Sequence, residues 1–223
     1  MDYNTSDYAR VFVRFKTPDN FLDKIVAVQE ELQKIDSSQE YNEPSDLHIS
    51  VASFVFLKQR SEFSRYENLV ARLGQSASEF SPFQISITGL YSFPTVIYSR
   101  VQDHPAGNLQ AIKQRIDAEL KREQWVEPIV AGTSYIPHVT IATFTTNDVR
   151  ALLHSIESEH FRSYDFGTGT VEELEIKELN VTGLHNHTLA GKLASFRKRW
   201  AVTDHTRETQ TNKPVLILTR KGS

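Results

Sequence analysis

The first half of the chain alternates between segments with a hydrophobic period of two and segments with a helical period. Residues 10–15 (RVFVRF) alternate apolar and polar side chains, which is typical of a half-buried strand. Apolar residues then recur at roughly helical spacing from Phe21 to Ile35. In order, the pattern predicts a strand over 10–15, a helix over 21–35, a strand over 47–57, a helix over 62–73 and a strand over 83–88.

The second half of the chain repeats this order. It predicts a strand over 96–101, a helix over 108–123, a strand over 136–144, a helix over 149–157 and a strand over 172–182. Two copies of strand, helix, strand, helix, strand indicate an α+β fold of two lobes rather than a series of parallel strand–helix–strand units. We expect one domain over residues 1–184, with lobe one at about 1–92 and lobe two at about 93–184.

We expect a bilobal arrangement around a central cleft. Each lobe holds an antiparallel-rich sheet, a pseudo-two-fold axis relates the two sheets, and the helices pack outside. Residues 185–223 have a weaker pattern and form a C-terminal extension. Within it, residues 190–202 predict a basic helix and residues 204–213 a polar tail. Residues 213–220 (KPVLILTR) favour an edge strand, where Pro214 is tolerated.

A seven-residue pattern occurs twice, 90 residues apart. HISVASF at 48–54 matches HVTIATF at 138–144 in chemical type at every position, and in identity at His, Ala and Phe. The spacing equals the offset between the two halves of the chain. A duplicated lobe explains both observations.

Strand geometry indicates what the repeat presents. Alternate side chains of a strand share a face and lie about 6.6 Å apart. His48 and Ser50 therefore point the same way, and so do His138 and Thr140. If a pseudo-two-fold axis relates the lobes, the two pairs face each other across one cleft.

Two opposed imidazoles suit in-line displacement at phosphorus. One removes a proton from the attacking oxygen and the other donates a proton to the leaving oxygen, since histidine populates both forms near neutral pH. The hydroxyls of Ser50 and Thr140 can donate hydrogen bonds to the non-bridging phosphate oxygens. This chemistry needs neither a metal nor a cofactor.

The two copies resemble the twin His-x-Thr/Ser signatures of the two-histidine (2H) phosphoesterase superfamily, which includes LigT-like 2′-5′ RNA ligases and cyclic phosphodiesterases. The resemblance covers about residues 10–184, including FQISITGLYSFP at 83–94. It implies a LigT-like fold, His48 and His138 as the catalytic histidines, and Ser50 and Thr140 as the phosphate-binding hydroxyls. It also implies metal-independent hydrolysis of a phosphodiester.

The leading hypothesis is a phosphodiesterase that hydrolyses the 2′,3′-cyclic phosphate of RNA ends or cyclic nucleotides. One alternative keeps the architecture and changes the reaction: 2′-5′ RNA ligation, cleavage of 2′-5′ oligoadenylate, or 3′-end trimming of RNA by an exonuclease. Another is a nucleotide- or RNA-binding module without turnover. The sequence does not assign the acid and base roles to the two histidines.

Composition limits the partners. The formal net charge of −3 and the pI near 6.2 give no overall positive field, so RNA contact must come from a local patch. The absence of cysteine excludes disulfides, thiolate catalysis and Cys-ligated metals. No signal segment opens the chain, and no apolar run nears the roughly 20 residues that span a bilayer. We expect a cytoplasmic monomer with no membrane or stable protein partner; a nuclear location stays open.

Several other side chains could serve the site. Tyr135, just before the second signature, could stack on a base. Three aromatic residues near the lobe junction could line the cleft, and three cations could meet the substrate phosphate: Tyr91, Phe93, Tyr98, Arg14, Lys58 and Arg100. His185-Asn186-His187 is interpreted as a solvated loop, 197–199 (RKR) as an exposed helix face, and 167–169 (GTG) as a turn.

Overall fold

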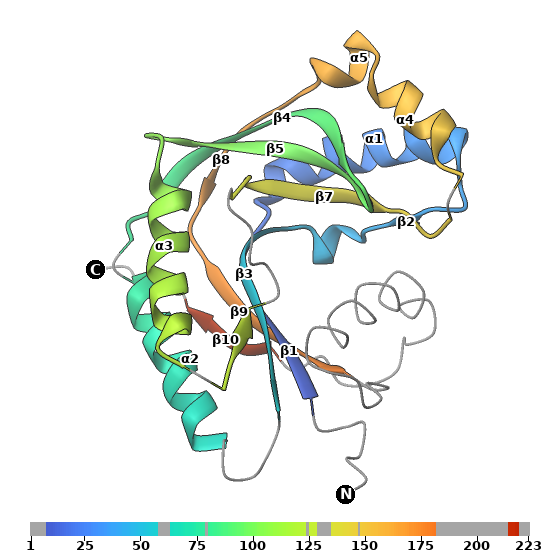
Figure 1. The fold of residues 1–223 in the computed structure, drawn as a ribbon. Coiled ribbons are helices and arrows are strands. Elements are labelled where there is room, and N and C mark those ends of the chain that lie inside the picture. The colour runs from blue at the N-terminus through green and yellow to red at the C-terminus, as the bar shows by residue number, and fades with distance from the viewer. Residues whose placement is uncertain are drawn as a thin grey trace, which may run out of the picture.

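A single antiparallel sheet that curls around itself forms the centre of the protein (Figure 1). The computed structural model describes residues 8–57, 63–78, 80–123, 125–128, 135–146, 148–181 and 214–218. Across these residues the strand order is β10-β9-β1-β3-β7-β5-β4-β8, with β2 beside β7 and β6 beside β3. The strands are β1 (Tyr8–Lys16), β2 (Glu40–Tyr41), β3 (His48–Leu57), β4 (Phe83–Phe93), β5 (Val96–His104), β6 (Glu127–Pro128), β7 (His138–Thr143), β8 (Asp165–Val171), β9 (Leu174–Val181) and β10 (Pro214–Leu218).

Helices cover the two halves of this sheet separately. The α-helices are α1 (Leu22–Ile35), α2 (Phe63–Ser78), α3 (Asn108–Lys121), α4 (Arg150–Ile156) and α5 (Glu159–Arg162), and the 3₁₀ helices are η1 (Asp19–Phe21) and η2 (Pro44–Asp46). Helices α2 and α3 pack together against the half that holds β3 and β9. Helices α1, α4 and α5 cover the half that holds β7 and β4 (Figure 1).

The strand order shows the predicted pseudo-two-fold symmetry. The series β9-β1-β3 in one half corresponds to β4-β5-β7 in the other. The halves meet where β3 pairs antiparallel with β7, at Ile49 and Val139. These residues are equivalent in the 90-residue repeat, and an antiparallel pair centred on equivalent residues has a local two-fold axis at its midpoint. The two predicted sheets are thus joined into one curled sheet.

Each half of the sheet draws strands from both halves of the sequence. Strand β4 ends at Phe93 and β5 begins at Val96, so a two-residue turn forces them to pair with each other. Strand β4 therefore joins the sheet half that contains β7, and β9 takes the equivalent place beside β1. The predicted lobes, 1–92 and 93–184, thus correspond to the sequence repeats and not to the two halves of the sheet.

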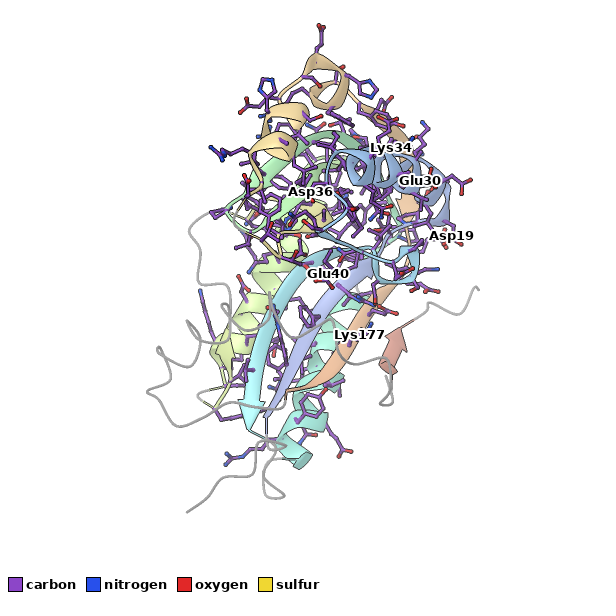
Figure 2. The ribbon with its side chains drawn as sticks, turned by 90° about the vertical axis from the view of Figure 1, so that its right-hand side faces the viewer. Asp19, Glu30, Lys34, Asp36, Glu40 and Lys177 are labelled. Carbon is purple, nitrogen blue, oxygen red and sulfur yellow. The ribbon has the colours of Figure 1, made fainter. Side chains whose placement is uncertain are left out.

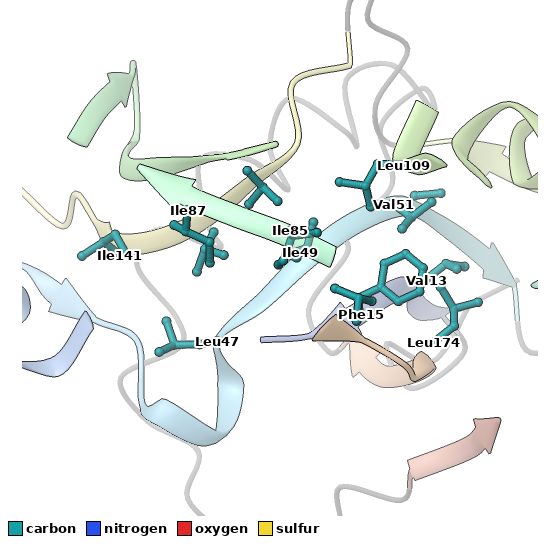
Figure 3. Packing of buried hydrophobic residues seen from close by; sticks show 14 of the residues in the cluster. Val13, Phe15, Leu47, Ile49, Val51, Ile85, Ile87, Leu109, Ile141 and Leu174 are labelled. Atoms are coloured by element: carbon teal, nitrogen blue, oxygen red, sulfur yellow. The ribbon is translucent and has the colours of Figure 1, made fainter. Parts of the chain in front are cut away.

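The hydrophobic core lies between the sheet and the helices. Ile49 and Val139, at the centre of the sheet, are fully buried, and they belong to the same cluster as the apolar side chains of α1 and α3. Figure 3 shows Ile49 and Val51 of β3 in this cluster with Leu109 of α3. Because successive side chains of a strand point to opposite faces, burying this face leaves His48 and its neighbours on the other one.

Strand β8 contradicts the expectation of a turn over 167–169. Those residues pair with β4 instead. The glycines have a steric reason: Gly167 has a φ of +102°, and a Cβ on Gly169 would lie 2.5 Å from a ring carbon of Phe21. The segment is therefore a strand that passes close under an aromatic ring.

At the opposite edge of the sheet, β10 pairs with β9 and begins at Pro214. Residues 182–213 lie outside the described part of the chain, and with them the predicted basic helix, the basic residues 197–199 and the histidines at 185 and 187. Among the described residues, no helix combines the length and the hydropathy required to cross a bilayer.

Candidate active site

The structure brings the four side chains of the repeat onto one face of the sheet. Ile49 of β3 pairs with Val139 of β7, and both point into the core. Continued by one residue on each side, this register sets His48 opposite Thr140 and Ser50 opposite His138. Directly opposed side chains have Cβ atoms about 4.5–5.5 Å apart. Two imidazoles and two hydroxyls thus form a compact group on two central strands.

Both imidazole rings are oriented by the same backbone contact. His48 Nδ1 lies 2.6 Å from the carbonyl oxygen of Asp46, and His138 Nδ1 lies 2.7 Å from that of Ile136. A carbonyl oxygen can only accept a hydrogen bond, so Nδ1 carries the hydrogen in each ring. The lone pair of the neutral ring is then on Nε2. Each histidine can accept a proton at Nε2 when neutral and donate one when charged.

Burial favours the neutral form of both rings. It lowers the pKa of His48 to about 4, and the nearby Arg14 guanidinium lowers it further, against the Asp46 carbonyl that favours the charged ring. Burial also lowers the pKa of His138, while the Ile136 carbonyl acts in the opposite direction. Both rings are half-buried on the open face of the sheet.

A network of charges surrounds His48. The guanidinium of Arg14, with 7% of the residue exposed, donates from Nε to Glu175 at 2.7 Å, and its Nη1 lies 3.2 Å from His48 Nδ1. Lys177 donates to Asp46 Oδ1 at 2.7 Å. Figure 2 shows Lys177 on strand β9, with α2 and α3 behind the sheet. Of the three candidate cations, Arg14 is the one beside a catalytic candidate.

Aromatic rings surround His138. Tyr98 and Phe93 meet the imidazole at centroid distances of 5.4 and 5.3 Å, and they stack on each other at 4.1 Å. Tyr91 lies 5.7 Å from Tyr98, and the Arg100 guanidinium covers the Tyr91 ring at 4.0 Å. The three aromatic residues suggested by the sequence therefore gather at one histidine, and Arg100 lies over one of them.

Tyr135 has a structural place that does not fit the expectation of base stacking. Its hydroxyl donates a hydrogen bond to the Ser50 carbonyl oxygen at 3.0 Å. Its ring packs against the core, with Lys113 Nζ of α3 5.9 Å from the ring centroid. Burial raises the pKa of the Tyr135 hydroxyl, which stays protonated. Tyr135 thus holds the backbone of β3 from the side of the helices.

Three charged residues of this face were not predicted from the sequence. Asp46 supplies a backbone carbonyl, which gives no sequence signal. Glu175 and Lys177 alternate with the buried residues Leu174 and Ile176, so the period of two does show that they point away from the core. Their relevance to the site depends on β9 lying beside β1, which is a tertiary feature.

No group of three His, Cys, Asp or Glu side chains within the described residues could hold a metal ion. The hydroxyls of Ser50 and Thr140 are half-buried on the face of the two histidines. Lys58, the remaining candidate cation, lies outside the described residues.

Comparison with known proteins identifies the family. A model of the 2′-5′ RNA ligase superfamily matches residues 21–181. The chain is 24% identical over 177 residues to an RNA 2′,3′-cyclic phosphodiesterase of Methanothermobacter thermautotrophicus, covering 78% of this chain and 91% of that protein. TT0787 of Thermus thermophilus has a TM-score of 0.52 at 16% identity, over 75% of this chain and 87% of that one. E. coli LigT in its apo form has a TM-score of 0.53 at 11% identity, over 78% and 88%, which shows the same fold. The chain belongs to the 2′-5′ RNA ligase superfamily of two-histidine phosphoesterases.

Proposed function

We propose that this protein is a metal-independent phosphodiesterase that hydrolyses the 2′,3′-cyclic phosphate of RNA ends or of cyclic nucleotides. One observation carries the proposal: two imidazoles on one face of paired strands, each with Nδ1 bound to a backbone carbonyl and Nε2 left for chemistry. The relative named as an RNA 2′,3′-cyclic phosphodiesterase supports this substrate class.

The reaction follows from the four side chains. Water attacks phosphorus while one imidazole removes a proton from it at Nε2. The other imidazole donates its Nε2 proton to the ribose oxygen that leaves. The hydroxyls of Ser50 and Thr140 donate hydrogen bonds to the non-bridging oxygens, where negative charge increases in the transition state. The product is a phosphomonoester.

Turnover of a 2′,3′-cyclic nucleotide in excess EDTA tests the proposal. His48→Ala and His138→Ala should each lose about 10²- to 10⁴-fold in kcat. Ser50→Ala and Thr140→Val should lose less than the histidine variants. His154→Ala, on the exposed surface of α4, is the matched control and should retain the wild-type rate.

Two results would overturn the proposal: loss of activity in EDTA, or full activity in both histidine variants. Product analysis on RNA ends separates it from the other reactions of the same architecture. A joined 2′-5′ product would indicate a ligase, cleavage confined to 2′-5′ oligoadenylate would indicate that phosphodiesterase, and stepwise shortening would indicate an exonuclease. Tight nucleotide binding without turnover would indicate a binding module.

A further inference from the structure

The pseudo-two-fold symmetry of the site is broken at one pair of positions. Strand β1 beside β3 is equivalent to β5 beside β7. On β1, Arg14 pairs with Ser50, and on β5, Tyr98 pairs with Thr140. The symmetry therefore relates Arg14 to Tyr98. The backbone contacts of the two imidazoles are the same, but one ring has a guanidinium for a neighbour and the other has an aromatic ring.

The contact between Arg14 and His48 is a close approach of a cation and not a hydrogen bond. The Asp46 carbonyl at 2.6 Å already takes the Nδ1 hydrogen of His48, and a guanidinium can only donate. Two N–H groups therefore face each other at 3.2 Å. Glu175 holds Arg14 there through Nε, at 2.7 Å, so the guanidinium cannot turn away without leaving a buried carboxylate partner.

The other charges near His48 pair among themselves. Lys177 bonds Asp46, which lies 4.0 Å from Arg14, and Lys16, the neighbour of His48 on β1, bonds Asp19 at 3.1 Å. The charge closest to the ring is thus the Arg14 cation, and it opposes protonation of His48.

His138 has no such neighbour among the side chains that contact its ring. Tyr98 and Phe93 carry no charge, and aromatic rings within about 6 Å attract cations. Arg100, opposite His138 on β5, lies over the Tyr91 ring instead. The opposite residue on β3 is Ser50, which is neutral. A proton on His138 therefore meets less electrostatic opposition than a proton on His48.

We propose that Arg14 distinguishes the two histidines, so that His48 is the general base and His138 the general acid. This inference rests on the proposed function and assigns the roles within it. Water oxygen bonds to phosphorus as the phosphorus–ribose oxygen bond breaks. His48 Nε2 takes a proton from the water, and the Nε2–H of protonated His138 gives its proton to the ribose oxygen. His48 then releases one proton to solvent, and His138 regains one.

Arg14 is a positioning residue in this scheme, because it acts through His48. NMR titration of the histidine rings tests that action directly. In Arg14→Met combined with Glu175→Gln, which removes both members of the pair, the pKa of His48 should rise and that of His138 should stay. Arg14→Lys retains the cation and should keep the His48 pKa low. Arg100→Met is the matched control and should leave the His48 pKa unchanged.

The role assignment is tested with a substrate whose leaving group needs no proton, a nucleoside 3′-(4-nitrophenyl phosphate) with a 2′-deoxyribose. His138→Ala should regain most of its lost rate on this ester relative to the cyclic nucleotide, because the acid is no longer required. His48→Ala should stay impaired on both, because water must still be deprotonated. The 2′-deoxyribose excludes attack by a neighbouring hydroxyl.

The outcomes separate the two proposals. Rescue of His48→Ala instead of His138→Ala would overturn the role assignment and leave the proposed function intact. An unchanged His48 pKa in the folded double variant would overturn the part of Arg14. Absence of turnover by the wild type on either substrate would overturn the proposed function and the role assignment with it.

Discussion

Mild acid should destabilise the folded protein through His48, and His48→Asn should remove that effect. Burial and the Arg14 cation lower the pKa of His48 to about 4, from an ordinary value of 6.5. Below pH 6.5 the unfolded chain therefore binds a proton that the folded protein does not. The resulting loss of stability is absent near neutral pH, increases as the pH falls from 6.5, and reaches its full value below about 4.

The size of the effect follows from the two pKa values. One pKa unit corresponds to about 1.4 kcal/mol, so the complete loss is about 3 kcal/mol. About 2 kcal/mol of it appears between pH 7 and pH 5. That is a large part of the roughly 5–15 kcal/mol by which a typical domain is stable. Asparagine suits the comparison because its amide can still donate to the Asp46 carbonyl and does not titrate.

The assay is urea unfolding followed by circular dichroism near neutral pH and again about two pH units lower. The free energy of unfolding of the wild type should fall by about 2 kcal/mol more than that of His48→Asn over this interval. His154→Asn, at an exposed histidine of α4, controls for the loss of an imidazole and should follow the wild type. An equal loss in wild type and His48→Asn would refute the reasoning.

Three further predictions concern packing and hydrogen bonds. Gln29→Leu should cost about 2–4 kcal/mol in thermal unfolding, because the buried Gln29 amide donates to two backbone carbonyls, each 2.9 Å away, that would lose a partner. Ser99→Ala should leave stability unchanged or raise it by about 1 kcal/mol, since the described residues offer its fully buried hydroxyl no hydrogen bond; a loss above that size would contradict this. Tyr135→Phe should lower stability by about 0.5–1.5 kcal/mol and leave KM for the cyclic nucleotide unchanged, and a raised KM would favour contact with substrate.

Local patterns predicted most of the elements because each reports a face that must be buried. The alternation over 10–15 lies within β1, and the predicted strand over 172–182 contains β9. The segment over 167–169 was misjudged because its glycines are typical of turns, whereas they are needed here for close passage under Phe21. A side chain from a distant segment made that difference, and local sequence cannot show it.

The sequence by itself determined the chemistry of the site. Two copies of a strand motif at a fixed spacing set a histidine and a hydroxyl on one face of each copy, because side chains alternate along a strand. The same alternation directed the apolar residues between them toward the helices. Those conclusions needed no knowledge of which strands are neighbours.

The tertiary structure alone decided how the two copies differ. Strand pairing set Arg14 beside Ser50 and Glu175, and it set Tyr98 at the equivalent place next to His138. Pairing of strands far apart in sequence depends on the whole sheet, so no local pattern specifies it. The electrostatic distinction between the two histidines arises there, since charges act through distance in space and not along the chain.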